Sequence, residues 1–149
     1  MKLNVNILLS RGMDMPTYAT DGSAAVDLRA ALDEGTTVVI APGERALIPT
    51  GIAISPESKD VVAVVAARSG LAIKQGICLS NGIGVIDSDY RGEICVGLHN
   101  TSSVPFTVNR GDRIAQMMFM PILTANFVAT TSLDETARGA GGFGSTGVK

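Results

Sequence analysis

Tryptophan is absent from this sequence, and its 149 residues include only one histidine and two cysteines. A lone histidine, His99, argues against a Ser-His or Cys-His nucleophilic mechanism. Cys78, Cys95 and His99 are also too few and too widely spaced for a zinc site. Both cysteines stand in apolar, strand-like surroundings, so we expect buried free thiols rather than a disulfide.

Long apolar runs and a strong net charge are missing as well. No stretch approaches the roughly 18 apolar residues of a membrane span. Residues 1–16 are too polar and alternating for a signal peptide, so we expect a cytoplasmic protein without membrane contact. The formal net charge is −2, which provides no overall basic field for nucleic acid. An anionic ligand would have to be held by local arginines and backbone amides.

The residues that are present favour β-structure with many turns. The chain is 46% hydrophobic, is rich in valine, isoleucine, alanine and threonine, and contains 17 glycines. Its length suits a single domain, residues 1–149, that can bury a core. From about residue 130 onward there is little to bury except Leu133 and Phe143. We therefore expect a core of about residues 1–129 and a flexible, glycine-rich C-terminal arm of about residues 130–149.

Short strands at intervals of about ten residues predict an all-β sandwich, barrel or jelly roll. The continuous apolar run Val61–Ala66 indicates a strand buried on both faces. One short helix is expected, with Ser69 as its N-cap, Leu71–Gln75 as its turns and Gly76 as its end. Strands are expected at Leu3–Leu9, Ala24–Ala30, Thr36–Ile40, Ala46–Ile54 with a break at Thr50–Gly51, Val61–Ala66, Val104–Val108, Arg113–Met120 and Ile122–Val128, besides the hairpin described next.

The stretch Asn81–Asn100 is predicted to form a β-hairpin with polar chemistry at its tip. Gly84 leaves the backbone bare, so a ligand can approach main-chain donors and acceptors. Asp87 offers a general base or an anchor for ion-bound water, and Tyr90 offers a flat wall. The alternative is a plain surface turn between two core strands, because Asp-Ser-Asp is common in turns.

Two further places could hold an anion. At Arg68–Gly70 a guanidinium, a hydroxyl and the amides of a helix start converge, although a simple N-cap beside a surface arginine is the alternative. In the arm, GAGGFG at Gly139–Gly144 matches GxGxxG, but no strand precedes it and no helix can follow, so we reject a Rossmann site. Its free amides still suit phosphates and Phe143 could stack on a base, unless the tail is merely disordered.

Five segments, in order and spacing, resemble the five motifs of the trimeric dUTP diphosphatases (dUTPases). They are AAVDLRA at 24–30, ARSGLA at 67–72, NGIGVIDSDYRGE at 81–93, RGDRIAQMMF at 110–119 and RGAGGFGSTG at 138–147. The resemblance implies a jelly-roll-like β-fold and a homotrimer with three active sites at subunit junctions. It also implies hydrolysis of dUTP to dUMP and pyrophosphate, which lowers dUTP and supplies dUMP for thymidylate synthesis.

The resemblance assigns roles to individual residues. Asp87 would hold and deprotonate the attacking water, and Tyr90 would pack on the deoxyribose and exclude a 2′-hydroxyl. Asp27 would hold waters on a Mg²⁺ chelated by the triphosphate, and Arg138 would meet the γ-phosphate. The other implied substrate-binding residues are Arg68, Ser69, Gly70 and Gln116 for the phosphates, Asn81, Gly84, Val85 and Ile86 for the uracil edge, Phe143 for stacking on uracil, and Gly144, Ser145 and Thr146 in the arm.

The implied chemistry is coherent on general grounds. A triphosphate carries about four negative charges, so Mg²⁺ and arginines must neutralise it. In-line attack at the α-phosphorus needs a positioned water and a nearby carboxylate base. Close backbone packing can reject the methyl group of thymine, and paired main-chain groups can reject cytosine.

Two departures and two rivals remain. Ala67 stands where the family usually has proline, and Ala25 where glycine is common, but neither change removes a chemical group. A dCTP deaminase-like enzyme shares the fold and similar motifs, yet its proton-shuttling glutamate would fall at Gly97. A non-catalytic nucleotide-binding trimer is the other alternative, and the complete set of charged groups argues against it.

Overall fold

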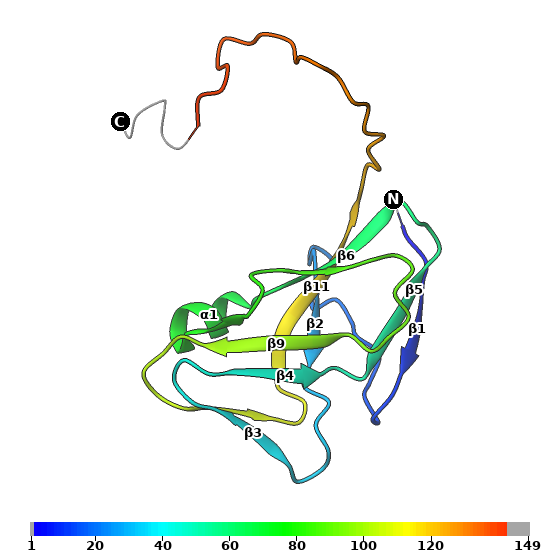
Figure 1. Cartoon of the computed structure of the whole chain (residues 1–149). Coiled ribbons are helices and arrows are strands. Elements are labelled where there is room, and N and C mark those ends of the chain that lie inside the picture. The colour runs from blue at the N-terminus through cyan, green and yellow to red at the C-terminus, as the bar shows by residue number, and fades with distance from the viewer. Residues whose placement is uncertain (1, 143–149) are drawn as a thin grey trace.

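A computed structural model of the chain describes residues 2–142, which form eleven strands and one short helix (Figure 1). The predicted all-β class with one helix is confirmed. The elements are β1 (Val5–Leu9), β2 (Val26–Arg29), β3 (Thr37–Ile40), β4 (Arg45–Pro49), β5 (Ile52–Pro56), β6 (Val61–Ala66), α1 (Ser69–Gln75), β7 (Ile77–Leu79), β8 (Gly84–Ile86), β9 (Cys95–Asn100), β10 (Phe106–Asn109) and β11 (Arg113–Pro121).

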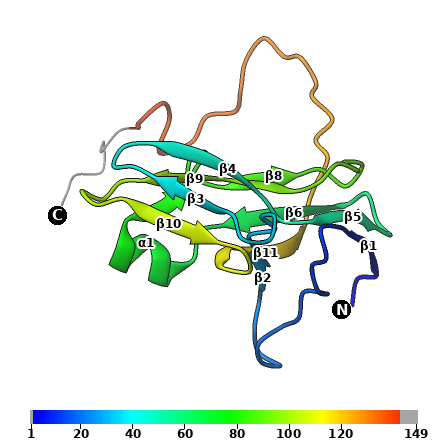
Figure 2. The same ribbon diagram turned by 90° about the horizontal axis from the view of Figure 1, so that it is seen from below.

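The strands pair antiparallel in four small sheets whose members are often distant in sequence. The sheet orders are β2-β11-β6-β8, β4-β9-β7, β1-β5 and β10-β3. Figure 2 shows the strands stacked in layers, with α1 at one end of the molecule and β1 at the other. This is the jelly-roll-like arrangement that the sequence predicts. No helix among the described residues is long and apolar enough to cross a membrane.

One hydrophobic core lies between the layers and takes side chains from nearly every strand. Leu28, Ile48, Ile77, Leu98 and Ile114 are almost completely buried and come from five different strands. Strand alternation produces this pattern, because every second side chain points to the same face of a sheet. On β2, the same alternation turns the polar residues away from the core.

The sequence predicts that the apolar strand β6 is buried on both faces, and this prediction is wrong. Ala63 and Val65 belong to the core, whereas Val62 and Val64 are only half-buried. Val64 pairs with Met118 of β11 and with Val85 of β8, and Val85 is 60% exposed. We call this surface, formed by Val62, Val64, Val85, Met118 and Met120, the outer face of the four-stranded sheet. Val85 and Met120 on this face are exposed and its other three side chains are half-buried, so the described part of the chain leaves the face partly open.

The N-cap predicted for the short helix is wrong by one residue, whereas its predicted end is confirmed. The predicted N-cap, Ser69, is already the first helical residue; Arg68 takes the N-cap position and makes no side-chain capping bond. Gly76 ends the helix as predicted, with φ +67. A Cβ at Gly76 would lie 2.9 Å from the Cβ of Ser102, so close packing adds to the conformational requirement for glycine.

The predicted hairpin Asn81–Asn100 is wrong as a pairing. β9 pairs with β7, Ile77 opposite Asn100, while β8 leaves that sheet and pairs with β6. The true hairpin is therefore β7–β9, and residues 80–94 form a long connection between its strands. Sequence alternation identified the strands but could not identify their partners, because apolar strands can pair with many others.

The predicted last strand, Ile122–Val128, is also wrong. Residues 122–142 contain no helix or strand and lead away from the body after β11 (Figure 1). Leu123 is 99% exposed and Phe127 is 93% exposed. The Ile122 N–H still donates to the carbonyl of Asp60 at 2.9 Å. A strand needs a partner edge for its backbone groups, and residues 123–128 take part in no strand pairing within the described part of this single chain.

The two cysteines are free, as predicted. Cys78 is half-buried, but Cys95 at the start of β9 is exposed, so the expected burial is wrong for Cys95. Partial desolvation of its sulfur nevertheless raises the pKa of Cys95, and the nearby negative charge of Glu93 acts in the same direction.

Asn100 is a fully buried polar side chain that joins the end of β3 to the loop between β9 and β10. Its Nδ2 donates to the carbonyls of Ile40 and Val104, each at 2.8 Å. Its Oδ1 accepts from both the main-chain N–H (3.0 Å) and the hydroxyl (2.8 Å) of Ser102. All the polar atoms of this amide are thus satisfied, which buried polar groups require.

Replacing Asn100→Ala should lower the free energy of unfolding by about 2–4 kcal/mol, because buried main-chain partners lose their hydrogen bonds. Urea denaturation followed by circular dichroism measures the change. Asn6→Ala, at an exposed position on β1, is the control and should be nearly neutral. Equal denaturation midpoints for the two variants would contradict this role of Asn100.

Candidate active site

Three of the predicted site segments meet on the four-stranded sheet. Asp27 of β2 lies opposite Gln116 of β11, and Gln116 lies opposite Ala66 of β6. The Gln116 amide donates to the carbonyl of Ala67 at 3.0 Å. The chain then continues into Arg68. Antiparallel pairing thus brings together residues separated by about half the chain, which no local pattern could do.

Asp27 is held between two arginines. Arg68 Nε donates to Asp27 Oδ1 at 2.8 Å, and Arg113 Nη1 donates to Asp27 Oδ2 at 3.3 Å. Arg68 Nη1 also donates to the carbonyl of Arg113 at 3.3 Å. Two guanidinium groups and one carboxylate leave an excess positive charge. Arg68 and Asp27 are about a quarter exposed, so water still screens these pairs.

Arg113 is a member of this cluster that sequence reasoning missed. It stands three residues before Gln116 in the quoted segment RGDRIAQMMF, so a signal was present. A register shift in β11 between Arg113 and Ala115 changes the alternation at this point. Strict alternation gave no reason to select Arg113. A cleft of about 340 Å³ borders both Arg68 and Arg113, with Gln75, Thr107 and Asp112 also on its wall.

Ser69 and Gly70 follow Arg68 at the surface. Both are exposed and form the first turn of α1. A Cβ at Gly70 would meet nothing within 4 Å, so this glycine leaves open space beside Arg68. The first amides of a helix have no partner within it. This corner therefore offers donors to a ligand: a hydroxyl, main-chain N–H groups and a guanidinium.

The connection at residues 80–94 carries the residues that the sequence analysis assigns to the nucleoside. Gly84 lies so close to β6 that a Cβ would be 3.0 Å from the Cβ of Val65. Val85 and Ile86 complete β8, and the exposed Asn81 precedes it with its carbonyl accepting from the N–H of Ile83 at 2.9 Å. Gly84 therefore allows close packing of β8 on β6, and β8, as the edge strand of its sheet, keeps one row of its backbone groups outside the described strand pairing.

Asp87 and Tyr90 stand at the two ends of one tight turn. The main-chain N–H of Tyr90 donates to the carbonyl of Asp87 at 3.1 Å, and both side chains are exposed. The Tyr90 ring lies against Gly92, where a Cβ would be 2.6 Å from the ring carbon that bears the hydroxyl. The Tyr90 hydroxyl donates to the carbonyl of Glu93 at 3.1 Å. Gly92 is therefore required for this position of the ring.

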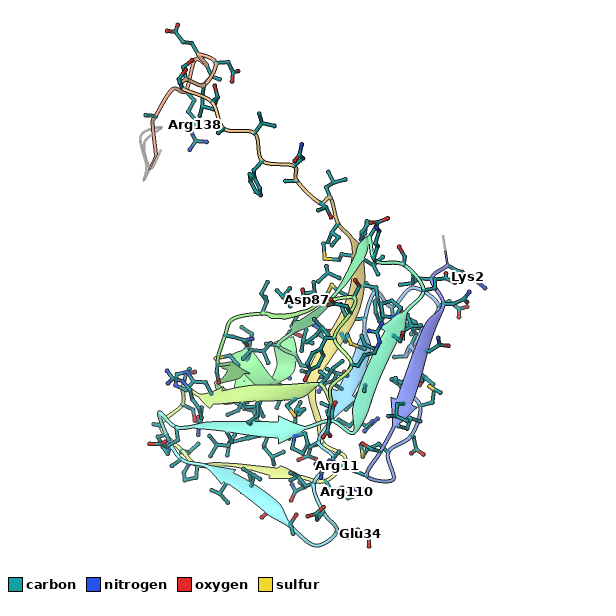
Figure 3. All side chains as sticks on the ribbon, turned by 45° about the vertical axis from the view of Figure 1, so that its right-hand side comes forward. Lys2, Arg11, Glu34, Asp87, Arg110 and Arg138 are labelled. Atoms are coloured by element: carbon teal, nitrogen blue, oxygen red, sulfur yellow. The ribbon has the colours of Figure 1, made fainter. Side chains whose placement is uncertain are left out.

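The cluster around Asp27 and the turn that carries Asp87 do not meet within the described part of one chain. Ile86 pairs with Ala63 and Gln116 pairs with Ala66, so their rows are separated by roughly 10 Å along β6. Asp87 lies one residue further on. Arg138 is more distant still, at the far end of the arm in Figure 3, where its Nε donates to the carbonyl of Gly141. Phe143, Gly144, Ser145 and Thr146 lie outside the described residues.

Asp27 could hold a divalent ion together with a phosphate ligand. The described residues contain no group of three or more His, Cys, Asp or Glu side chains placed to hold a metal. Asp27 uses one hydrogen bond on each carboxylate oxygen, and a carboxylate has about four acceptor positions. Its remaining positions fit water molecules of a hydrated Mg²⁺ carried by a phosphate ligand.

Fold and site together define a class of protein: a jelly-roll-like β-protein whose paired arginines suit a phosphate-bearing ligand, with a carboxylate and a tyrosine on a glycine-rich connection. The dUTPase family model matches residues 11–147. The deoxyuridine 5'-triphosphate nucleotidohydrolase of Desulfitobacterium hafniense is 58% identical over 134 residues, covering 90% of this chain and 87% of that protein. The protein of the same name from Rhizobium rhizogenes is 48% identical, with coverage of 97% and 92%.

Solved structures agree with these relatives. The dUTPase of Staphylococcus bacteriophage 80alpha, solved with dUPNHPP, is 27% identical and superimposes with a TM-score of 0.84, covering 99% of both chains. The chain belongs to the dUTPase family.

Gly92→Ala should displace the Tyr90 ring, because the added Cβ would overlap it. In a Tyr18→Phe background Tyr90 is the sole fluorescent aromatic apart from weakly emitting phenylalanine, since the chain has two tyrosines and no tryptophan. We expect acrylamide to quench Tyr90 fluorescence more strongly in Gly92→Ala. Gly22→Ala, where a Cβ would meet nothing within 4 Å, is the control and should not change quenching. Unchanged quenching in Gly92→Ala would contradict the described contact.

Proposed function

We propose that this chain hydrolyses dUTP to dUMP and pyrophosphate by attack of water on the α-phosphorus. The observation that carries the proposal is the cluster of Asp27, Arg68, Arg113 and Gln116 in a member of the dUTPase family. Its relatives are named deoxyuridine 5'-triphosphate nucleotidohydrolases. In the cell, such a reaction lowers dUTP and supplies dUMP for thymidylate synthesis.

The cluster forms the phosphate half of the proposed site. Arg68, Ser69, Gly70 and Gln116 bind phosphate oxygens, and the excess positive charge of the arginines opposes the charge of the triphosphate. Asp27 orients both guanidinium groups and accepts from waters on Mg²⁺. When bound, Mg²⁺ supplies charge neutralisation and holds the phosphates in one geometry.

The connection at residues 80–94 forms the nucleoside half. Asn81 and the backbone at Gly84–Ile86, on the edge strand β8, hydrogen-bond the uracil edge. Tyr90 packs on the deoxyribose, and its fixed ring leaves no room for a 2′-hydroxyl. Asp87 is exposed at the end of β8, where it can accept the proton of the attacking water.

A homotrimer completes the site by joining groups that one chain keeps apart. Asp87 is roughly 10 Å or more along the strand from the row of Asp27, and Arg138 lies beyond the body. The outer face of the four-stranded sheet is apolar, and the arm exposes Leu123, Phe127 and other large apolar side chains. Burying these surfaces against other copies stabilises an oligomer. Arg138, Phe143, Gly144, Ser145 and Thr146 of another copy then close over the nucleotide.

The rival reactions lack support in the described residues. A deaminase needs a proton-shuttling carboxylate on the strand after the connection, but Gly97 occupies that place on β9, with Ser80 as its neighbour. A non-catalytic binding module needs no exposed carboxylate such as Asp87. Water attack therefore fits the residues better than either alternative.

Incubation with dUTP and Mg²⁺ should release dUMP and pyrophosphate, whereas dCTP should release no ammonia. Asp87→Asn should reduce kcat by about 10²–10⁴-fold, the usual contribution of a general base, while dUTP still binds. Asp89→Asn, two residues away in the same turn, is the matched control and should keep near-normal turnover. Absence of pyrophosphate at micromolar enzyme would refute the reaction, and full turnover in Asp87→Asn would remove Asp87 as the base.

Deleting residues 138–149 should also abolish turnover while leaving the body folded, because the described part of this segment buries little. Mixing this truncated chain with Asp87→Asn chains tests whether sites are shared. In a randomly mixed trimer, half of the chains carry Asp87 and half carry the arm, so about a quarter of shared sites are complete. Turnover should recover to about that fraction of the unmodified enzyme's value. No recovery after demonstrated subunit exchange would place the arm and Asp87 in one chain.

A further inference from the structure

The Glu93 side chain links the connection at residues 80–94 to two distant turns by hydrogen bonds. Glu93 does not belong to the proposed nucleotide-binding set. Its Oε1 accepts from the main-chain N–H of Gly51 at 2.8 Å and from Arg11 Nε at 3.0 Å. Its Oε2 accepts from Arg11 Nη2 at 3.4 Å. The carboxylate therefore points toward the β4–β5 turn, which contains Gly51, and toward the turn after β1, which contains Arg11 and is called the N-terminal turn below.

Both partners of Glu93 are held in place by their own surroundings. Gly51 has φ +70, and a Cβ there would lie 2.8 Å from the carbonyl oxygen of Ser10. Arg11 has φ +53, the one positive φ of a non-glycine residue among residues 2–142. Arg110 donates to the main-chain carbonyls of Arg11 and Leu32, and Figure 3 shows Arg110 beside Arg11. The hydrogen bonds from Arg110 thus hold the main chain of the N-terminal turn, and this turn places the guanidinium of Arg11 beside Glu93.

The other side of Glu93 leads directly to Tyr90. The Tyr90 hydroxyl donates to the Glu93 carbonyl, and the ring lies against Gly92. The next residue, Ile94, is buried, and its N–H donates to the carbonyl of Ile52 at 2.8 Å. The main chain at Glu93 is therefore fixed by its own carboxylate and by its buried neighbour. A shift of this peptide would move the acceptor of the Tyr90 hydroxyl.

We propose that Glu93 is a positioning residue that fixes the Tyr90 ring and thereby sets the preference for deoxyribose over ribose; the second part rests on the proposed function. Tyr90 is 44% exposed, so packing alone does not fix the ring. The contribution of Glu93 to overall stability is small, because Arg11 is 42% exposed and such ion pairs are screened by water. Its main effect falls on local geometry, where a small displacement of a wall admits one hydroxyl group.

The test uses Tyr90 as the sole fluorescent tyrosine in a Tyr18→Phe background of the full-length protein. Glu93→Ala should increase acrylamide quenching of Tyr90 and lower the ratio of kcat/KM for dUTP to that for UTP by at least about tenfold. Glu93→Gln keeps an acceptor for the Gly51 N–H and should restore both properties in part. Arg11→Met removes the partner instead of Glu93 and should act in the same direction, so a folding failure of Glu93→Ala leaves the test intact.

The matched control is Glu57→Gln. Glu57 also accepts two hydrogen bonds, from the N–H and the side-chain amide of Asn4, but at the far end of the β1–β5 sheet. It should change neither Tyr90 quenching nor the dUTP/UTP ratio. In a Tyr90→Ala background, adding Glu93→Ala should leave the ratio unchanged, because Glu93 acts through that ring.

The outcomes separate this inference from the proposed function. Unchanged quenching and unchanged selectivity in both Glu93→Ala and Arg11→Met would overturn the inference. Increased quenching with an unchanged ratio would overturn its second part. If the unmodified chain hydrolyses no dUTP but quenching still increases in Glu93→Ala, the proposed function fails while the positioning of Tyr90 by Glu93 stands.

Discussion

The pairing of β11 with both β2 and β6 is the constraint on which the rest of the site depends. This register sets Asp27, Gln116 and Ala66 in one row across the sheet. Because side chains alternate between faces, a slip of one residue would turn Asp27 and Gln116 into the core and bring apolar side chains to the surface. Burial of Leu28 and Met117 opposes that slip. The hydrophobic core thus determines where the polar groups of the proposed phosphate half can lie.

The same sheet keeps the two halves of the proposed site apart within one chain. β8 adds to the far edge of the sheet and places Asp87 well along β6 from Asp27. The sheet is too rigid to bring the two together, since its register is fixed by continuous backbone hydrogen bonds. The outer face and the arm also expose apolar side chains, which other copies of the chain could bury. Catalysis and assembly would then depend on the same geometry.

The residues behind the site differ in kind from those facing it. Asp27, Arg68 and Tyr90 are the residues proposed to meet the nucleotide, whereas Glu93, Arg11 and Arg110 make hydrogen bonds that hold the main chain in place. Such supporting contacts join the N-terminal turn, the β4–β5 turn and the connection at residues 80–94. A tyrosine that is partly exposed can serve as a fixed wall only if the peptide beneath it cannot move.

The sequence alone determined the β-class, most strand positions, the helix with its end at Gly76, and the segments that carry polar chemistry. These are local properties: alternation, β-branched composition and glycine follow from steric rules within a few residues. Only the tertiary structure decided that β8 pairs with β6 and not β9, that β6 keeps one half-open face, and that Ile122–Val128 forms no strand in the described chain. It also decided that Arg113 joins Asp27 and that Glu93 reaches Arg11. Partner choice between distant segments depends on how the whole chain closes around its core, and no local pattern records that.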